Sequence, residues 1–186
     1  VAAPAEVAAG IVACLIGGPN GDYTYSDDDQ SRLVACLKDF AHRGFGLMIT
    51  TSRRTPEKLA AGIKDAVRDT NALFWDGGEN NPYPDFLAHA DMFLITADSV
   101  SMTCEAAATG RPIYVFPPSG GGAKFDRFHA AMSAKGITRA LSAPFVFETW
   151  SYAPLDCAGA IAREIERRFV ARARMIPGLC QRDQNE

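Results

Sequence analysis

Apolar runs of strand length recur along the chain, and each ends at a glycine, a proline or a polar residue. Continuous runs such as GIVACLIGG, without polar alternation, are typical of strands that a sheet buries on both faces. The pattern predicts five strands, over residues 10–18, 45–52, 71–75, 91–96 and 112–116.

Segments of helical periodicity connect these runs. Leu33, Leu37 and Phe40 fall on one stripe of the first segment, which follows Ser26, a residue type that caps helix N-termini. The second segment opens with Thr55 as its expected N-cap. Helices are predicted over 26–44, 55–70, 83–90, from Asp98 or Ser99 to Gly110, 124–136 and 155–174.

Strand and helix alternate five times with connections of helix length, which is typical of parallel sheets. The predicted fold is an α/β, Rossmann-like doubly wound parallel sheet of about five to six strands. The stretch 143–150 is ambiguous between an edge strand and a loop.

Because the chain opens with Val1 in an Ala- and Pro-rich stretch, we expect it to be the end of a longer polypeptide. The expected organisation is a linker or end of a preceding region at 1–10, a Rossmann-like domain at 11–154, a C-terminal amphipathic helix of the same domain at 155–174, and a tail at 175–186.

The composition, with 47% hydrophobic and 22% charged residues, is that of a soluble globular domain. A net charge of -3 argues against broad electrostatic binding to nucleic acid. No apolar run approaches the roughly 20 residues that span a bilayer, so we do not expect a transmembrane protein. Five cysteines without a CxxC pair favour reduced, packed thiols and therefore a cytoplasmic location.

Ligands of doubly wound sheets bind outside the carboxyl ends of the strands, so the residues that follow each strand are the candidates. Gly17, Gly18 and Asn20 follow the first strand in a glycine loop, where the backbone could approach a ligand closely. The loop matches neither GxGxxG nor a P-loop, and a plain tight turn is the alternative.

Ser52, Arg53 and Arg54 follow the second strand, directly before a helix N-terminus. Guanidinium groups, a hydroxyl and free backbone N–H groups are the donors that hold a phosphate. The equally open alternative is that one arginine pairs with Glu57 while the other faces water.

The fourth strand runs into a turn that opens a helix of small residues. Its first backbone N–H groups would form an anion site, and Glu105, one turn further, could accept hydrogen bonds from ribose hydroxyls. The alternative is a helix cap with a glutamate that complements the helix dipole. The candidate turn consists of Asp98, Ser99, Val100, Ser101 and Met102.

A glycine loop follows the fifth strand and leads to Lys124, a further phosphate-binding candidate at a helix N-terminus. His129 is more typical of a surface histidine than of a catalytic one. No Cys/His metal spacing occurs, so no metal is expected. No cofactor is expected either. The acidic run 27–29 is expected to be a solvated first helical turn.

The segments TTSRRTP, ENNPYPDFLAHAD and ITADSVSMTCEAAATGRPIYVF, flanked by GGPNGDY and KFDRFH, carry a family resemblance. The chain resembles the mitochondrial fission (plant elongated-mitochondria) family and its bacterial homologues, which are often labelled nucleoside-diphosphate-sugar epimerases. More distantly, the DSVSM-containing block is similar to the C-terminal donor-binding domain of GT-B glycosyltransferases, which is one half of that fold.

The resemblance implies roles by position. Glu105 would hold the ribose, and the Ser99–Met102 turn would hold the diphosphate. Arg53 or Arg54 would neutralise phosphate charge, while the Trp75–Asn81 loop would border the base. The implied ligand is a nucleoside diphosphate-sugar, with a UDP-sugar expected.

The resemblance also implies a missing half, since two-domain enzymes carry the acceptor site and catalytic base in an N-terminal domain. We therefore expect an N-terminal partner domain packed on the C-terminal helix, and we assign no catalytic residue. One alternative is a nucleotide-sugar epimerase, for which His129 and Asp126 are the acid/base candidates. The other is a non-enzymatic interaction module, like the plant members that engage a dynamin-type partner.

Overall fold

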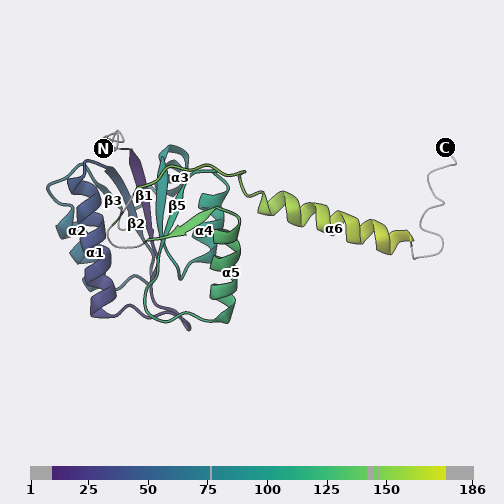
Figure 1. Cartoon of the computed structure of the whole chain (residues 1–186), viewed down its shortest axis with the longest axis horizontal. Helices are drawn as coiled ribbons and strands as arrows, with labels where there is room; N and C mark the ends of the chain where they lie inside the picture. Colours follow the sequence, from purple (N-terminus) through teal and green to yellow (C-terminus); the bar gives the residue numbers. More distant parts are fainter. Residues whose placement is uncertain (1–9, 76, 142–144, 146, 175–186) are drawn as a thin grey trace, which may run out of the picture. The chain divides into compact units, whose positions relative to one another are not determined.

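The structure, a computed structural model, describes residues 10–75, 77–141, 145 and 147–174. A six-stranded, entirely parallel sheet has the order β3-β2-β1-β4-β5-β6 (Figure 1). The predicted Rossmann-like α/β fold is confirmed, and all five predicted strands are present with slightly narrower limits. The strands are β1 (Ile11–Ile16), β2 (Gly46–Thr51), β3 (Leu73–Trp75), β4 (Met92–Thr96), β5 (Ile113–Phe116) and β6 (Thr138–Ala140).

Helices connect the strands as predicted. Ser26 caps the first helix with a reciprocal capping box, in which its hydroxyl accepts from the Asp29 N–H and the Asp29 carboxylate accepts from the Ser26 N–H. The helices are α1 (Asp27–His42), α2 (Glu57–Ala66), α3 (Tyr83–His89), α4 (Val100–Ala107), α5 (Ala123–Ala134) and α6 (Cys157–Arg174).

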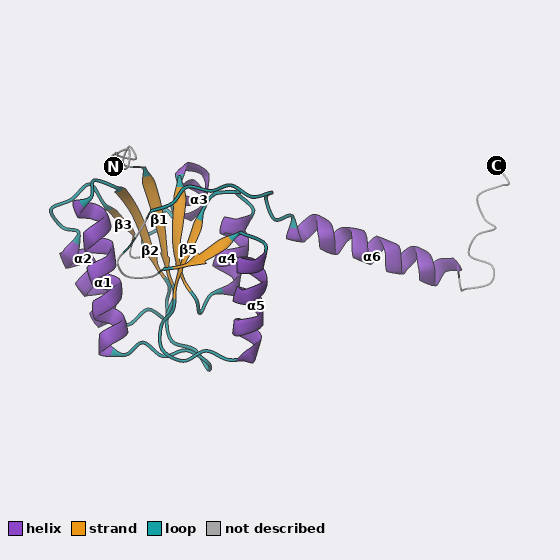
Figure 2. Cartoon of the chain, in the orientation of Figure 1, coloured by secondary structure: helices purple, strands orange, loops and turns teal. Residues whose placement is uncertain are grey.

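The sheet is covered on both faces, with α1 and α2 on one side and α4 and α5 on the other (Figure 2). Alternate residues of β1 point to opposite faces, so Cys14 and Ile16 join Leu37 of α1 in one hydrophobic core cluster. On the other face, Ala106 and Ala107 of α4 are fully buried. The small side chains of α4 therefore let this helix pack closely on β4 and β5.

The structure decides between the two alternatives for 143–150, since its described residues belong to no strand; residues 143, 144 and 146 lie outside the described part. The edge strand after β5 is β6, which the sequence pattern did not predict. The expected N-cap of α2 was wrong: Thr55 does not hold this position, which Pro56 occupies. Its hydroxyl donates instead to the Gly17 carbonyl, 2.6 Å away, and so ties β2 to the loop after β1.

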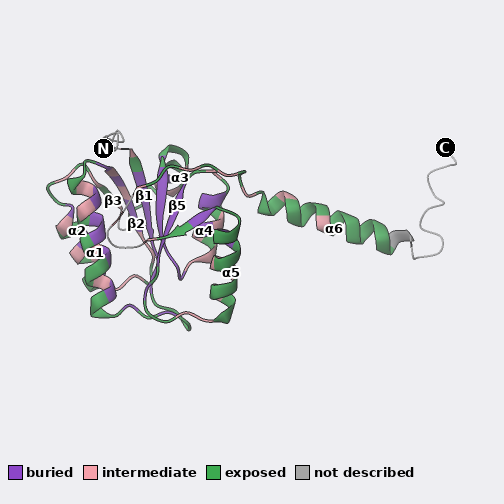
Figure 3. Ribbon diagram, in the orientation of Figure 1, coloured by how far each residue is buried: buried purple, intermediate pink, exposed green. Residues whose placement is uncertain are grey.

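The chain divides into two compact units, one ending at Pro154 and the other beginning at Leu155. The sheet belongs to the first unit and α6 to the second. Figure 3 shows α6 mostly in the colour of exposed residues. Its large apolar residues are among them, with Ile161 at 61%, Ile165 at 62% and Phe169 at 69% exposure. Membership of α6 in the same domain as the sheet stays a prediction.

Candidate functional site

The strand order places a topological switch point between β1 and β4, where the chain moves from one half of the sheet to the other. In doubly wound sheets the crevice outside the carboxyl ends of these two strands is the usual ligand site. The loops that form it here follow Ile16 and Thr96. The predicted candidates after β1 and β4 therefore lie at this switch point.

A buried carboxylate occupies the crevice. The side chain of Asp98 is fully buried and accepts hydrogen bonds from the Gly18 N–H at 3.0 Å, the Tyr25 hydroxyl at 2.6 Å and the Arg54 guanidinium at 3.1 Å. Burial raises the pKa of Tyr25, and the adjacent Asp98 charge raises it further, so the phenol keeps the proton that it donates. The Asp98 side chain thus joins three loops.

The glycine pair after β1 makes room for these contacts. A Cβ atom on Gly17 would lie 2.2 Å from Asp98 Oδ2, and one on Gly18 would lie 2.2 Å from the Arg54 carbonyl oxygen. Asn20 closes the same loop, because its Oδ1 accepts from the N–H groups of Asp22 and Tyr23 at 2.8 Å each. Close packing within the protein is a sufficient reason for the two glycines.

The two adjacent arginines have different environments. Arg54 donates to the carbonyls of Gly18 at 2.7 Å and Pro19 at 2.9 Å, besides Asp98. Arg53 is exposed, and within the described residues its guanidinium has no hydrogen bond or ion pair; neither arginine pairs with Glu57 there. Arg53 is therefore the arginine of this loop that is available to an anion.

The serine that precedes these arginines also has internal partners. The Ser52 N–H donates to Thr55 Oγ1 at 2.9 Å, and Ser52 Oγ accepts from the Arg54 N–H at 3.2 Å. This local turn fixes the backbone of the loop that presents Arg53.

The first turn of α4 has unpaired donors. Ser99 is the N-cap, and its hydroxyl accepts from the Met102 N–H at 3.4 Å. The N–H groups of Val100 and Ser101 have no acceptor within the described part of the chain. Such groups, aligned with the positive end of the helix dipole, favour an anion at this position.

Glu105 lies on the exposed side of α4 and accepts a hydrogen bond from the hydroxyl of Tyr83, the first residue of α3. Burial raises the pKa of Tyr83, and the hydrogen bond with Glu105 and its charge raise it further. Sequence reasoning missed Tyr83, because 22 residues separate it from its partner.

The loop before α5 is joined to the loop after β1. The Gly121 N–H donates to the Asp22 carbonyl at 2.8 Å, and the Ser119 N–H donates to Asp29 Oδ2 at 3.0 Å. Gly120 has a φ of 100°, and a Cβ there would lie 2.5 Å from the Asp22 oxygen. Lys124, exposed in the first turn of α5, is carried by this braced loop.

The acidic run 27–29 was expected to be a solvated helical turn, and this expectation was wrong for Asp29. Asp27 and Asp28 are exposed, but Asp29 is 1% exposed and links Ser26 of one loop to Ser119 of another. Burial alone would raise the pKa of Asp29, but hydrogen bonds from Ser119 and Ser26 outweigh it and lower the pKa. The capping-box spacing was the sequence signal for this role.

His129 and Asp126, the acid/base candidates of the epimerase alternative, line a cavity of about 310 Å³ between α5 and the sheet. The His129 Nε2 atom lies 2.8 Å from the Ala97 carbonyl oxygen, directly before Asp98. Because a carbonyl only accepts, Nε2 carries a proton in this contact. His129 therefore braces the turn between β4 and α4.

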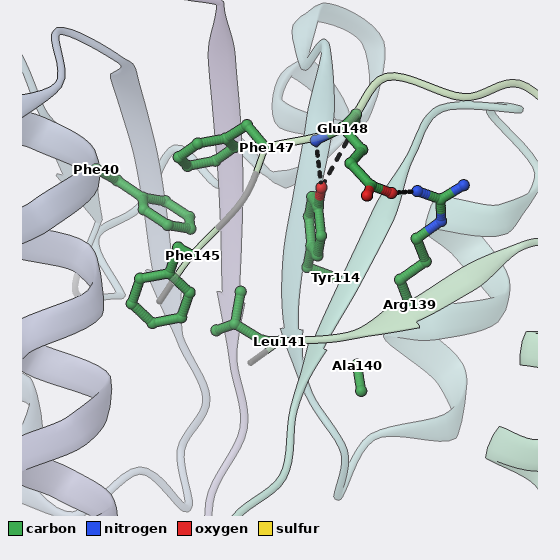
Figure 4. A pocket seen from close by; sticks show the side chains of 8 residues that line it. All are labelled: Phe40, Tyr114, Arg139, Ala140, Leu141, Phe145, Phe147 and Glu148. Atoms are coloured by element: carbon green, nitrogen blue, oxygen red, sulfur yellow. Dashed lines mark hydrogen bonds and ion pairs between the residues drawn. The ribbon is translucent and has the colours of Figure 1, made fainter. Parts of the chain in front are cut away.

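A second pocket, of about 290 Å³, lies on the α1 side of the sheet (Figure 4). The Tyr114 hydroxyl lies between the backbone N–H and carbonyl of Glu148, at 2.7 and 3.3 Å, and the Glu148 side chain pairs with Arg139. This pocket is separate from the switch point. It is lined by Phe40, Tyr114, Arg139, Ala140, Leu141, Phe145, Phe147 and Glu148.

The described residues contain no cluster of three or more His, Cys, Asp or Glu side chains arranged to hold a metal ion. None of the helices described combines the length and apolar character that crossing a bilayer requires.

Comparisons with solved structures give distant similarities. A shikimate 5-dehydrogenase from Mycobacterium fortuitum is 20% identical, with a TM-score of 0.42 over 71% of this chain and 44% of that protein. A molybdenum cofactor carrier protein from Chlamydomonas reinhardtii is 12% identical, with a TM-score of 0.47 over 86% of this chain and 98% of that protein. At these values, neither similarity bears on a ligand of this chain.

Sequence comparisons are more specific. Residues 2–169 match the family model described as mitochondrial fission ELM1. The mitochondrial fission protein ELM1 of Arabidopsis thaliana is 33% identical over 164 residues, which are 87% of this chain and 38% of that protein. An uncharacterized protein of Rickettsia prowazekii is 32% identical over 160 residues, or 83% of this chain and 45% of that protein. The chain thus spans less than half of either relative, and it belongs to the mitochondrial fission ELM1 family.

Proposed function

We propose that this domain binds a nucleoside diphosphate-sugar, with a UDP-sugar as the expected ligand, as the donor half of a glycosyltransferase-like protein. The observation that carries the proposal is the first turn of α4, where the N–H groups of Val100 and Ser101 have no protein acceptor in the described residues. A diphosphate would accept from them and gain from the helix dipole.

The charges around this turn favour an anion despite the nearby carboxylate. The negative charge of Asp98 is buried and paired with Arg54, so its repulsion of a diphosphate is largely cancelled. Arg53 follows β2 at the same edge of the sheet and has no internal partner in the described part of the chain. In this proposal Arg53 neutralises phosphate charge, and Lys124 adds a second exposed cation.

The nucleoside would extend from the diphosphate towards Glu105. A carboxylate accepts hydrogen bonds from both hydroxyls of a vicinal diol, which suits the ribose of a nucleotide. Glu105 is exposed and lies less than two turns from the first residue of α4. Trp75 and residues 77–81 would then border the base.

The role of this half in catalysis would be electrostatic. Donors fixed by the fold at the α4 turn would stabilise the charge that develops on a leaving diphosphate. The acceptor site and catalytic base would lie in an N-terminal partner domain. This division fits the coverage of 38% and 45% of the two curated relatives.

The apolar stripe of α6 would be the surface that meets this partner domain. Ile161, Ile165 and Phe169 repeat at intervals of four residues and are each more than 60% exposed. Contiguous exposed apolar side chains on a helix usually mark a surface for another protein part. We propose that these residues pack on the N-terminal domain of the longer protein.

A cytoplasmic location is part of the same proposal. Cys14 and Cys36 are free and buried, and burial raises the pKa of both thiols. Buried thiols of this kind are unreactive packing groups, as is usual for proteins in a reducing compartment.

The second candidate is a non-enzymatic interaction module, which the similarity to a plant mitochondrial fission protein favours. In that case the switch-point loops would serve only the fold. Calorimetric titration with UDP, GDP and their sugars separates the two candidates. UDP binding that weakens in Glu105→Ala supports the nucleotide proposal, whereas no binding by this chain or by the longer protein refutes it.

A further inference from the structure

One side-chain hydrogen bond connects α3 with α4. Tyr83 donates its hydroxyl hydrogen to Glu105 Oε2, and Tyr83 is partly buried while Glu105 is exposed. The raised pKa of Tyr83, caused first by burial and then by Glu105, keeps the phenol protonated at neutral pH. The phenol is thus the donor in this contact, and Glu105 Oε2 is the acceptor.

The contact restricts the Glu105 carboxylate. A glutamate on a helix surface otherwise samples many rotamers, and a ligand that orders it must offset the lost entropy. With Oε2 held by Tyr83, the Oε1 atom has no hydrogen-bond partner within the described residues. One oxygen is therefore fixed and the other is left to accept from a ligand.

Tyr83 is itself held by the loop before α3. Its backbone N–H donates to the Asn81 side-chain oxygen at 3.0 Å, in the segment proposed to border the base. Phe86, in the first turn of α3, is 2% exposed and anchors the helix in the core. The phenol thus extends from an anchored helix rather than from a free loop.

We propose that Tyr83 is a positioning residue that orients Glu105 to accept hydrogen bonds from the ribose diol. The role rests on the proposed nucleotide binding, and it adds a specific requirement: the preference for a ribose over a sugar without hydroxyls depends on the Tyr83 phenol. Tyr83 need not touch the nucleotide, since its effect passes through the Glu105 carboxylate.

The test compares two ligands in three proteins. The 186-residue chain, Tyr83→Phe and Tyr152→Phe are titrated calorimetrically with UDP and with 2′,3′-dideoxy-UDP. Tyr152→Phe is the matched control, because its hydroxyl also donates one hydrogen bond, to the Arg111 carbonyl at 2.6 Å. We expect Tyr83→Phe to weaken UDP binding about 2- to 10-fold and to leave the dideoxy analogue unchanged, as loss of one hydrogen bond would.

The outcomes separate positioning from a structural role. Equal weakening of both ligands in Tyr83→Phe would mean a general distortion of the site and would overturn the role of Tyr83. Unchanged UDP binding in this variant, with normal binding by the wild type, overturns that role alone. Absence of UDP binding by the wild type overturns the proposed function as well.

A measurement without nucleotide checks the contact itself. Nuclear magnetic resonance of ring-labelled tyrosine, assigned with Tyr83→Phe, follows the ionisation of each phenol with pH. We expect the Tyr83 phenol to titrate above the ordinary tyrosine range and to move back towards it in Glu105→Gln. A phenol that titrates identically in both proteins would show that the contact does not form, and would overturn the proposal.

Discussion

The guanidinium of Arg54 lies 3.1 Å from the buried carboxylate of Asp98, and this contact distinguishes two arginines that are adjacent in the sequence. Arg54 joins β2 to the loops after β1 and β4, whereas Arg53 faces solvent. The two adjacent arginines thus have different roles. Arg54 maintains the crevice, and Arg53 is left for a ligand.

Replacing the Asp98 carboxylate should therefore lower stability. Asp98→Asn removes the charge that pairs with Arg54 and leaves poorly matched donors on Gly18 and Tyr25. Because Arg54 is partly exposed, we expect a loss of about 1–3 kcal/mol in the free energy of unfolding by urea. Asp28→Asn, at a side chain that is 81% exposed, is the control and should change it by less than about 0.5 kcal/mol. Equal effects of the two variants would contradict the assigned role.

The glycines after β1 give a second stability test. A methyl group on Gly17 would meet Asp98 Oδ2 at 2.2 Å, whereas nothing lies within 4 Å of a Cβ on Gly21. We expect Gly17→Ala to lower the free energy of unfolding by about 1–3 kcal/mol through overpacking, and Gly21→Ala to be nearly neutral. Thermal and urea unfolding measure both. A neutral Gly17→Ala would mean that the crevice is looser than described.

Asp29 should make stability depend on pH in the acid range. Its pKa is lowered in the folded protein, relative to 3.8 for an ordinary aspartate, so the folded state favours the charged form. The resulting stabilisation is present above the unfolded pKa and is lost as the pH falls through the folded pKa. Urea midpoints from about pH 7 down to about pH 2 should therefore fall less steeply in Asp29→Asn than in the wild type. An equally steep fall of the urea midpoint with pH in the wild type and in Asp29→Asn would contradict the lowered pKa assigned to Asp29.

Strands β1 to β5 could be predicted from the sequence, because continuous apolar runs bounded by glycine and proline leave little ambiguity. The strand order, and with it the switch point between β1 and β4, was not predicted, because it depends on pairing between distant segments. β6 could not, since only Thr138 of its three residues is buried and the segment has no apolar run. The cap at Ser26 was predictable from local spacing. The position of Thr55 was not, because its hydroxyl bonds to a carbonyl 38 residues away.

The residues of the candidate site also differ in how far the sequence could predict them. Residues that follow strands were predictable, since parallel strands bring their carboxyl ends to one edge. The difference between Arg53 and Arg54, and the link from Tyr83 to Glu105, depend on contacts between distant segments. No local pattern encodes such contacts.

The α6 stripe predicts a difference between this chain and a longer protein that includes the proposed N-terminal domain. Ile165 is 62% exposed, so Ile165→Ser should leave the unfolding of the 186-residue chain nearly unchanged. If the stripe packs on a partner domain, the same change in the longer protein should cost about 1–3 kcal/mol of burial energy. Glu166→Ser, at an exposed polar position of α6, is the control. No effect of Ile165→Ser in the longer protein would contradict the proposed packing.

The most direct test of nucleotide binding uses Arg53. The 186-residue chain is titrated calorimetrically with UDP, alongside Arg53→Ala and the control Lys58→Ala, an exposed cation of α2 that pairs with Asp27. We expect the wild type and Lys58→Ala to bind alike and Arg53→Ala to bind about tenfold more weakly, as loss of one charge-assisted contact implies. Absence of UDP binding, or equal affinities of wild type and Arg53→Ala, would contradict a diphosphate site at the first turn of α4 beside Arg53.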